Sequence, residues 1–107
     1  EVYERVLERT GAPPPIVDSR DVLEDPVRVL GLLCEAVGVE FSDAMLSWPA
    51  GRRDSDGVWA AHWYDQVERS TGFHGYRPKS DRVPEELTGL LEECQACYDR
   101  LYAERLV

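Results

Sequence analysis

The sequence predicts an α/β fold in which helices dominate and a single short strand is present. Apolar residues recur with helical spacing in four stretches, near residues 2–10, 26–37, 59–70 and 84–101. The β-branched pair Ile16-Val17, which follows three prolines, is the only good strand candidate. A single strand cannot satisfy its own backbone hydrogen bonds. Either this pair is therefore not a strand, or its sheet lies outside these 107 residues.

The two N-terminal helices have recognisable start and stop residues. Gly11 ends the first helical stripe. Asp25 is a good N-cap and Pro26 suits the first turn of a helix that runs to about Val37, where Gly38 provides the stop. This second helix is apolar on nearly all sides, which is typical of a helix buried all round. We expect partners outside this segment to cover it.

The central helix is predicted from three apolar residues at a spacing of four. Trp59, Trp63 and Val67 fall on one face. Asp65 and Arg69 lie four apart on the other side, in the favourable order with the acid first. The sequence Thr71-Gly72 then closes the helix.

The loop before this helix contains the only Arg-Arg pair, Arg52-Arg53. Two guanidinium groups near a helix N-terminus form good anion-binding chemistry, because free N–H groups and the helix dipole add to the arginine forks. The alternative is an ordinary solvated turn in which Asp54 and Asp56 pair with the arginines.

The last helix is predicted to begin at Pro84 and to carry an apolar stripe as far as Leu101. Cys94 and Cys97 form a C-x-x-C pair on that stripe. A redox pair would open a helix rather than lie deep inside one, and a zinc site would need two further ligands. The sequence therefore favours core packing of both thiols and no metal site. His62 has no acidic or nucleophilic partner fixed by the sequence, which favours a surface histidine over a general base.

Composition limits the classes of function. The hydrophobic share of 43% is enough for a core, and the length allows one domain at most. A net charge of −9 disfavours nucleic-acid binding. Basic side chains gather locally at Arg52-Arg53 and between Arg69 and Arg82, where a small anionic ligand could bind. No membrane span or secretory leader is recognisable, and three cysteines without a secretion signal predict reduced thiols and a cytoplasmic location.

The order of these features resembles the later part of P-loop sulfotransferases. Residues 16–26 look like the late strand and D-x-L-x-D-P turn of that family, and residues 29–39 resemble the following helix with its L-C-x-x-x-G-v ending. Residues 41–46 fit the next turn. Residues 52–60 fall on the family's R-K-G-x-x-G-D-W-K signature. The arrangement looks closest to bacterial sulfotransferase-like proteins with a G-V-W-A-x-H-W-Y segment.

The signature is matched in part. Arg52, Gly57 and Trp59 match it, and Arg53 replaces a lysine. The departures are Asp54, Val58 and Ala60, which stand where the family has Gly, Asp and Lys.

The resemblance implies a partial domain, with residues 1–107 forming the C-terminal part of a three-layer αβα sandwich of the P-loop type. It implies that Arg52 and Arg53 grip the 3′-phosphate of 3′-phosphoadenosine 5′-phosphosulfate (PAPS). Gly57 would let the backbone approach, and Trp59 would anchor the loop in the core. The longer parent protein would transfer a sulfuryl group from PAPS to a hydroxyl or amine acceptor. Its catalytic base and phosphosulfate loop would lie upstream, and this segment alone would be inactive.

A second class of function fits the same sequence. The apolar helices at 27–37 and 87–101 could belong to a non-enzymatic helical module that docks on a partner chain. In either case the exposed apolar faces predict that this segment alone is poorly stable or associates with itself.

Overall fold

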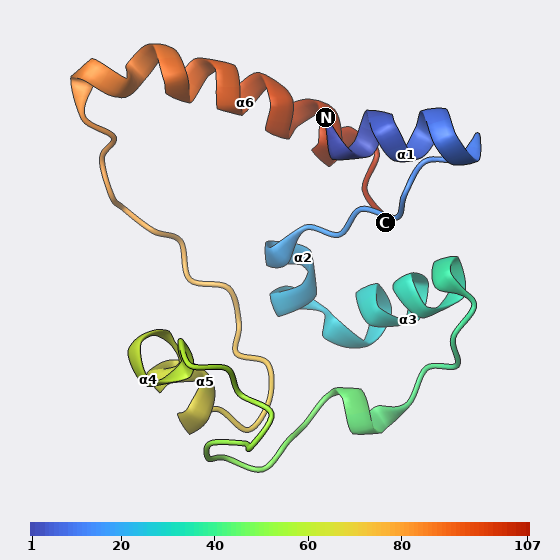
Figure 1. Ribbon diagram of the computed structural model, residues 1–107, viewed down its shortest axis with the longest axis vertical. Helices are drawn as coiled ribbons and strands as arrows, with labels where there is room; N and C mark the ends of the chain where they lie inside the picture. Colours follow the sequence, from blue (N-terminus) through green and yellow to red (C-terminus); the bar gives the residue numbers. More distant parts are fainter.

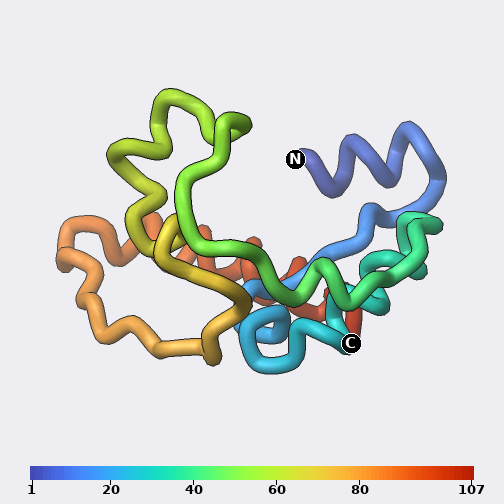
Figure 2. Tube along the Cα trace, turned by 90° about the horizontal axis from the view of Figure 1, so that it is seen from below, coloured from blue at the N-terminus to red at the C-terminus, as the bar shows by residue number.

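The computed structural model describes residues 1–107 and shows helices joined by long coil segments in an open, C-shaped arrangement (Figures 1 and 2). The α-helices and 3₁₀ helices (η) are α1 (Val2–Thr10), α2 (Ser19–Glu24), α3 (Pro26–Val37), η1 (Asp43–Met45), α4 (Ala60–Trp63), α5 (Asp65–Arg69), η2 (Glu85–Leu87) and α6 (Thr88–Ala103). No helix is long and apolar enough to cross a lipid bilayer.

The predicted helix boundaries near the N-terminus are confirmed. Gly11 ends α1 with φ 72°, and Gly38 ends α3 with φ 73°, both in the left-handed region that glycine adopts at low cost. The Asp25 carboxylate accepts a hydrogen bond from the backbone N–H of Arg28 at 3.2 Å, as expected of an N-cap. These local signals work because they depend on residues only a few positions apart.

The strand candidate Ile16-Val17 forms no strand within these 107 residues, and the alternative of a sheet outside them stays a prediction. The segment is extended but pairs with no strand, and the Ile16 carbonyl instead accepts a hydrogen bond from the backbone N–H of Leu106 at 2.8 Å. The β-structure of the chain is limited to an isolated antiparallel bridge between Ser47 and Gly72. The reason is that the 107 residues supply no neighbouring strand, so the αβα sandwich stays a prediction.

Helix α2 was not predicted as a helix. The Asp18 carboxylate caps it by accepting a hydrogen bond from the backbone N–H of Arg20 at 2.9 Å. The signal was present in the Asp18-Ser19 dipeptide, but six residues are too few to show a helical period.

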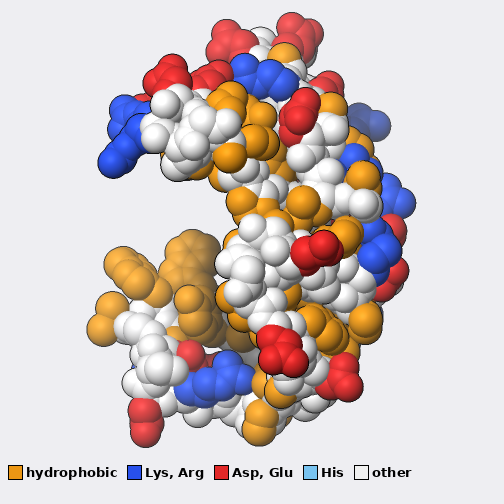
Figure 3. Space-filling view, turned by 90° about the vertical axis from the view of Figure 1, so that its right-hand side faces the viewer, with side chains coloured by type: hydrophobic (Ala, Val, Ile, Leu, Met, Phe, Trp, Pro, Cys, Tyr) orange, Lys and Arg blue, Asp and Glu red, His pale blue; other side chains and the backbone are white.

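The chain encloses very little core. Val29, Cys34 and Ala60 are its buried residues, and its accessible surface is 8950 Å². A compact protein of this mass exposes about 6,000 Å². The radius of gyration is 16.9 Å, against about 13 Å expected for a compact domain of this length. The space-filling view shows the same openness as a deep notch beside gathered apolar side chains (Figure 3).

Helix α3 is only partly covered by this chain, in agreement with the expectation that residues outside this segment would be needed to cover it. Val29 is fully buried and Cys34 nearly so, but Val27 and Val37 are each about half exposed. The stripe on α6 is more open still, with Leu90 58% exposed and both of its cysteines exposed. The predicted core packing of Cys94 and Cys97 is therefore wrong, because no element of this chain packs on the middle of α6.

Only the end of α6 is fixed to the rest of the chain, at a contact that we call the C-terminal junction (residues 98–106 against residues 4–21). Tyr98 donates a hydrogen bond to Asp18 at 2.8 Å, and Arg105 donates to Asp21 at 2.7 Å. Arg100 pairs with Glu4 of α1 at 2.8 Å. The junction therefore holds the N-terminal and C-terminal parts of the chain together.

Candidate functional site

The arginine loop (residues 48–59) is anchored at its start to the segment that follows α5. The backbone N–H of Trp48 donates to the Thr71 carbonyl at 3.0 Å, and its indole N–H donates to the Ser70 hydroxyl at 2.9 Å. The Trp48 ring also meets the Phe73 ring edge to face, with centroids 5.3 Å apart. Trp48 thus fixes where the loop leaves the rest of the molecule.

Two further features shape the loop. Gly51 has φ 118°, a backbone conformation that residues other than glycine rarely adopt. Its N–H donates to the Glu68 carbonyl at 2.7 Å. Asp56 closes the turn: its carboxylate accepts from the backbone N–H of Arg53 at 2.8 Å, and its own N–H donates to the Arg53 carbonyl at 3.0 Å. The loop backbone is therefore held at both Gly51 and Asp56.

The side chains of Arg52 and Arg53 are exposed and take part in no ion pair or side-chain hydrogen bond within the chain. The pairing of the arginines with Asp54 and Asp56 does not form, because Asp56 bonds the backbone of Arg53 rather than its guanidinium. The exposure of both arginines still fits the alternative of an ordinary solvated turn. Both arginine forks are available to an anion.

The helix predicted after the loop is broken into α4 and α5 at Tyr64, which has φ −101° and ψ 9°. An amphipathic helix depends mainly on packing of its apolar face. That packing is missing, since Trp59 and Trp63 are 67% and 74% exposed. The expected ion pair between Asp65 and Arg69 is present at 2.8 Å.

This break changes two expectations. Trp59 does not anchor the loop in a core, and Trp48 performs the anchoring instead. A helix of four residues adds little dipole, so the anion chemistry of the loop depends on the arginine side chains. Gly57 has open space where a Cβ would stand, so nothing in this chain requires glycine there, and its role toward a ligand stays a prediction.

The remaining candidates from the sequence are His62 and the side chains that could bind a metal ion. His62 is exposed on α4, which confirms the prediction of a surface histidine. No group of three or more His, Cys, Asp or Glu side chains is placed to hold a metal ion.

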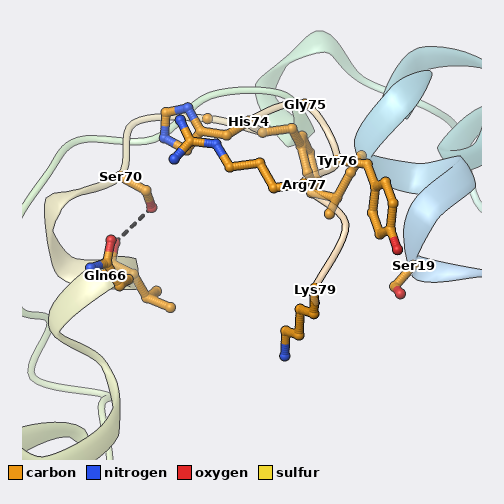
Figure 4. Close-up of a pocket in the computed structure, with 12 residues that line it drawn as sticks. Ser19, Gln66, Ser70, His74, Gly75, Tyr76, Arg77 and Lys79 are labelled. Atoms are coloured by element: carbon orange, nitrogen blue, oxygen red, sulfur yellow. Dashed lines mark hydrogen bonds between the residues drawn. The ribbon is translucent and has the colours of Figure 1, made fainter. Parts of the chain in front are cut away.

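A concave region, which the sequence only hinted at, lies between α2, α5 and the coil at residues 70–79. It is an open groove of about 690 Å³ and carries basic side chains from the coil, including Arg77 and Lys79 (Figure 4). The gathering of basic residues after Arg69 was visible in the sequence. Their placement opposite Ser19 and Leu23 of α2 was not, because it depends on a contact between distant parts of the chain.

Comparison with known proteins identifies the class. The family model described as "Sulfotransferase domain" matches residues 3–103, and the chain belongs to this family. The chain is also 36% identical over 91 residues to the "Branched-chain-amino-acid aminotransferase-like protein 2" of Arabidopsis thaliana and, to the same degree, to the similarly named protein 1. No solved structure matches.

The alignments with these two plant proteins cover 85% of this chain but 16% of each relative. The chain thus spans a small part of the curated relatives it matches, and their names describe much longer proteins. The likeness to bacterial sulfotransferase-like proteins stays a prediction.

Proposed function

We propose that this chain is the 3′-phosphate-binding portion of a sulfotransferase that transfers a sulfuryl group from PAPS to a hydroxyl or amine acceptor. Membership of the sulfotransferase-domain family supports the class of reaction. The observation that carries the assignment to this segment is the unpaired Arg52-Arg53 side chains on a loop held at Trp48, Gly51 and Asp56.

The donor set fits a phosphate group. Each guanidinium presents parallel N–H groups that match two phosphate oxygens, and such charge-assisted bonds are stronger than neutral ones. Because Asp56 is occupied by the backbone of Arg53, phosphate has no carboxylate to displace. PAPS supplies the sulfuryl group when it is bound. The contribution of Arg52 and Arg53 is to bind and orient the nucleotide at its 3′ end, at a distance from the bond that breaks.

The test measures nucleotide binding to the protein that carries this chain. Arg52→Ala and Arg53→Ala should each weaken binding of adenosine 3′,5′-bisphosphate by about 1–3 kcal/mol, the scale of a charge-assisted hydrogen bond. The loss should be absent for adenosine 5′-phosphate, which lacks the 3′-phosphate. Titration calorimetry with both nucleotides gives the comparison.

Arg9→Ala is the matched control, because Arg9 is exposed on α1 and takes part in no ion pair, so the change in net charge is the same. Equal affinity for the two nucleotides, unchanged by either loop substitution, would remove the assignment. That result would favour the helical interaction module, for which the exposed stripe of α6 is the supporting feature.

A further inference from the structure

The groove between α2, α5 and the coil at residues 70–79 has the size of a small-molecule site. Its volume of about 690 Å³ lies within the range of about 300–1,000 Å³ that ligand pockets occupy. Neither Arg52 nor Arg53 lines it, so it is separate from the anion site of the arginine loop.

The charge of the groove is opposite to that of the molecule. The chain carries a net charge of −9, yet the lining contains Arg77, Lys79 and His74 and no carboxylate. Arg77 and Lys79 form no ion pair, whereas Arg20, on the neighbouring helix α2, is paired with Glu24 at 2.8 Å. Figure 4 shows Arg77 lying beside His74, with Lys79 projecting separately from the same coil. Cations with no counter-ion of their own favour an anionic ligand.

Four apolar side chains line the groove as well, beside the polar Ser19, Gln66 and Ser70, and two of the four are held by other contacts. Phe73 is held by the edge-to-face contact with Trp48, and Tyr76 lies under the Arg20 guanidinium, 5.2 Å from its ring centroid. Leu23 and Val67 face the same space from α2 and α5. Two aromatic rings and two aliphatic side chains beside unpaired cations suit a molecule with a flat apolar body and one anionic group.

We propose that this groove binds a small organic anion that consists of an aromatic or other flat apolar body and a phosphate-, sulfate- or carboxylate-type group. Arg77 and Lys79 neutralise the anionic group, and Phe73 and Tyr76 cover the apolar body. The proposal does not depend on the function of the arginine loop, because the two sites share no charged residue.

The experiment uses phenyl phosphate as the probe, with inorganic phosphate and phenol as its two halves, in titrations followed by backbone amide NMR. Phenyl phosphate should shift the amides of residues 66–79 and bind at least tenfold more tightly than either half. Arg77→Ala and Lys79→Ala should each weaken its binding roughly fivefold or more, the lower end of the effect of a lost charge-assisted bond. Lys79→Arg should retain most of the affinity.

Arg9→Ala again controls for net charge and should leave binding unchanged. Amide spectra of each variant without ligand show whether the coil at residues 70–79 has kept its structure. Equal effects of Arg9→Ala and Arg77→Ala would overturn the proposal. Loss of phenyl phosphate binding in Arg52→Ala or Arg53→Ala, with Arg77→Ala unaffected, would also overturn it by placing the ligand at the arginine loop. Loss of nucleotide binding in the loop variants bears only on the sulfotransferase proposal.

Discussion

Arg105 at the C-terminal junction and the Arg52-Arg53 pair carry the same functional group in opposite surroundings. The Arg105 side chain is 20% exposed, pairs with an Asp21 side chain that is 14% exposed, and lies 3.5 Å from the centre of the Tyr102 ring. The side chains of Arg52 and Arg53 are exposed and unpaired. The difference arises because Asp21 is presented by a helix that needs no bond from it, whereas Asp56 already bonds its own loop backbone. An arginine thus stabilises the fold where an unbonded carboxylate and an aromatic ring lie within its reach. Where neither is present, its side chain stays available to a ligand.

The largest expected effect on stability is at Arg105. Arg105→Ala leaves Asp21 partly buried without its cation, and we expect the folding equilibrium constant to fall roughly tenfold, the scale of one lost charge-assisted hydrogen bond. Arg100→Ala is the control, because its pair with Glu4 is about half exposed on both sides and such surface pairs contribute little. Urea unfolding of both variants gives the measurement. Similar urea midpoints for the two variants would mean that burial of the Arg105–Asp21 pair does not add to the stability of the fold.

The next effect is a pH dependence of the junction. The hydrogen bond to Asp18, aided by partial burial and by the charge of Asp18, raises the pKa of Tyr98 from 10.0 to about 12. Because the folded pKa lies above the unfolded one, the stabilisation is fully present below pH 10 and is lost as the pH rises toward 12. Tyrosinate absorbance should show one late-titrating tyrosine, absent in Tyr98→Phe.

Asp18, which accepts the same hydrogen bond, has a pKa shifted in the opposite direction. Partial burial by itself would raise the pKa of Asp18, but hydrogen bonds from Tyr98 and from the backbone N–H groups of Arg20 and Asp21, together with the charge of Arg105, lower it below 3.8. Its contribution is therefore present above pH 3.8 and is lost as the pH falls through the lower folded value. Loss of the junction NMR shifts at a pH already above 3.8 would contradict the direction given for Asp18.

The arginine loop should respond much less in stability. Arg52→Ala and Arg53→Ala each remove an exposed, unpaired side chain, so we expect the free energy of unfolding to change by about 0.5 kcal/mol or less. Urea unfolding of both loop variants and of Arg105→Ala under the same conditions allows the three free energies of unfolding to be compared. A loss as large as that of Arg105→Ala would show that the loop arginines have structural partners.

The smallest effect is expected in the middle of α6. Cys94 and Cys97 are exposed, so Cys94→Ala and Cys97→Ala should each change the free energy of unfolding of this chain by no more than about 0.5 kcal/mol. Core packing, as the apolar stripe predicted, would instead cost about 1 kcal/mol or more per thiol. A larger loss in a longer protein than in these 107 residues would show that other residues cover this face.

The sequence predicted what depends on neighbours along the chain. The Asp25 cap, the Gly11 and Gly38 stops and the Asp65–Arg69 pair all involve residues within a few positions of one another, and all are confirmed. Burial was predicted poorly, since apolar stripes on α3 and α6 show which face could be covered but not whether a partner exists. The Arg52-Arg53 pair was visible in the sequence. That Asp56 would bond the backbone of Arg53, and so leave both guanidinium groups unpaired, depended on the conformation of the turn.

The groove and the junction could not have been predicted from local patterns. Both join residues far apart in the chain, Ser19 with Lys79 in the groove and Arg105 with Asp21 at the junction. The family resemblance predicted the class of protein, and the match to the sulfotransferase-domain family confirms it.

The bonds of the C-terminal junction close very long loops, since Tyr98 and Asp18 are 80 positions apart and Arg105 and Asp21 are 84 apart. The covalent chain therefore acts as the tether that gives residues 98–106 a high effective concentration near α1 and α2. One proteolytic cut in the exposed coil at residues 77–82 would turn closure of this loop into the association of two separate peptides. With so few contacts at the junction, the cut piece that carries α6 should dissociate on dilution, although the cut breaks no bond of the junction itself.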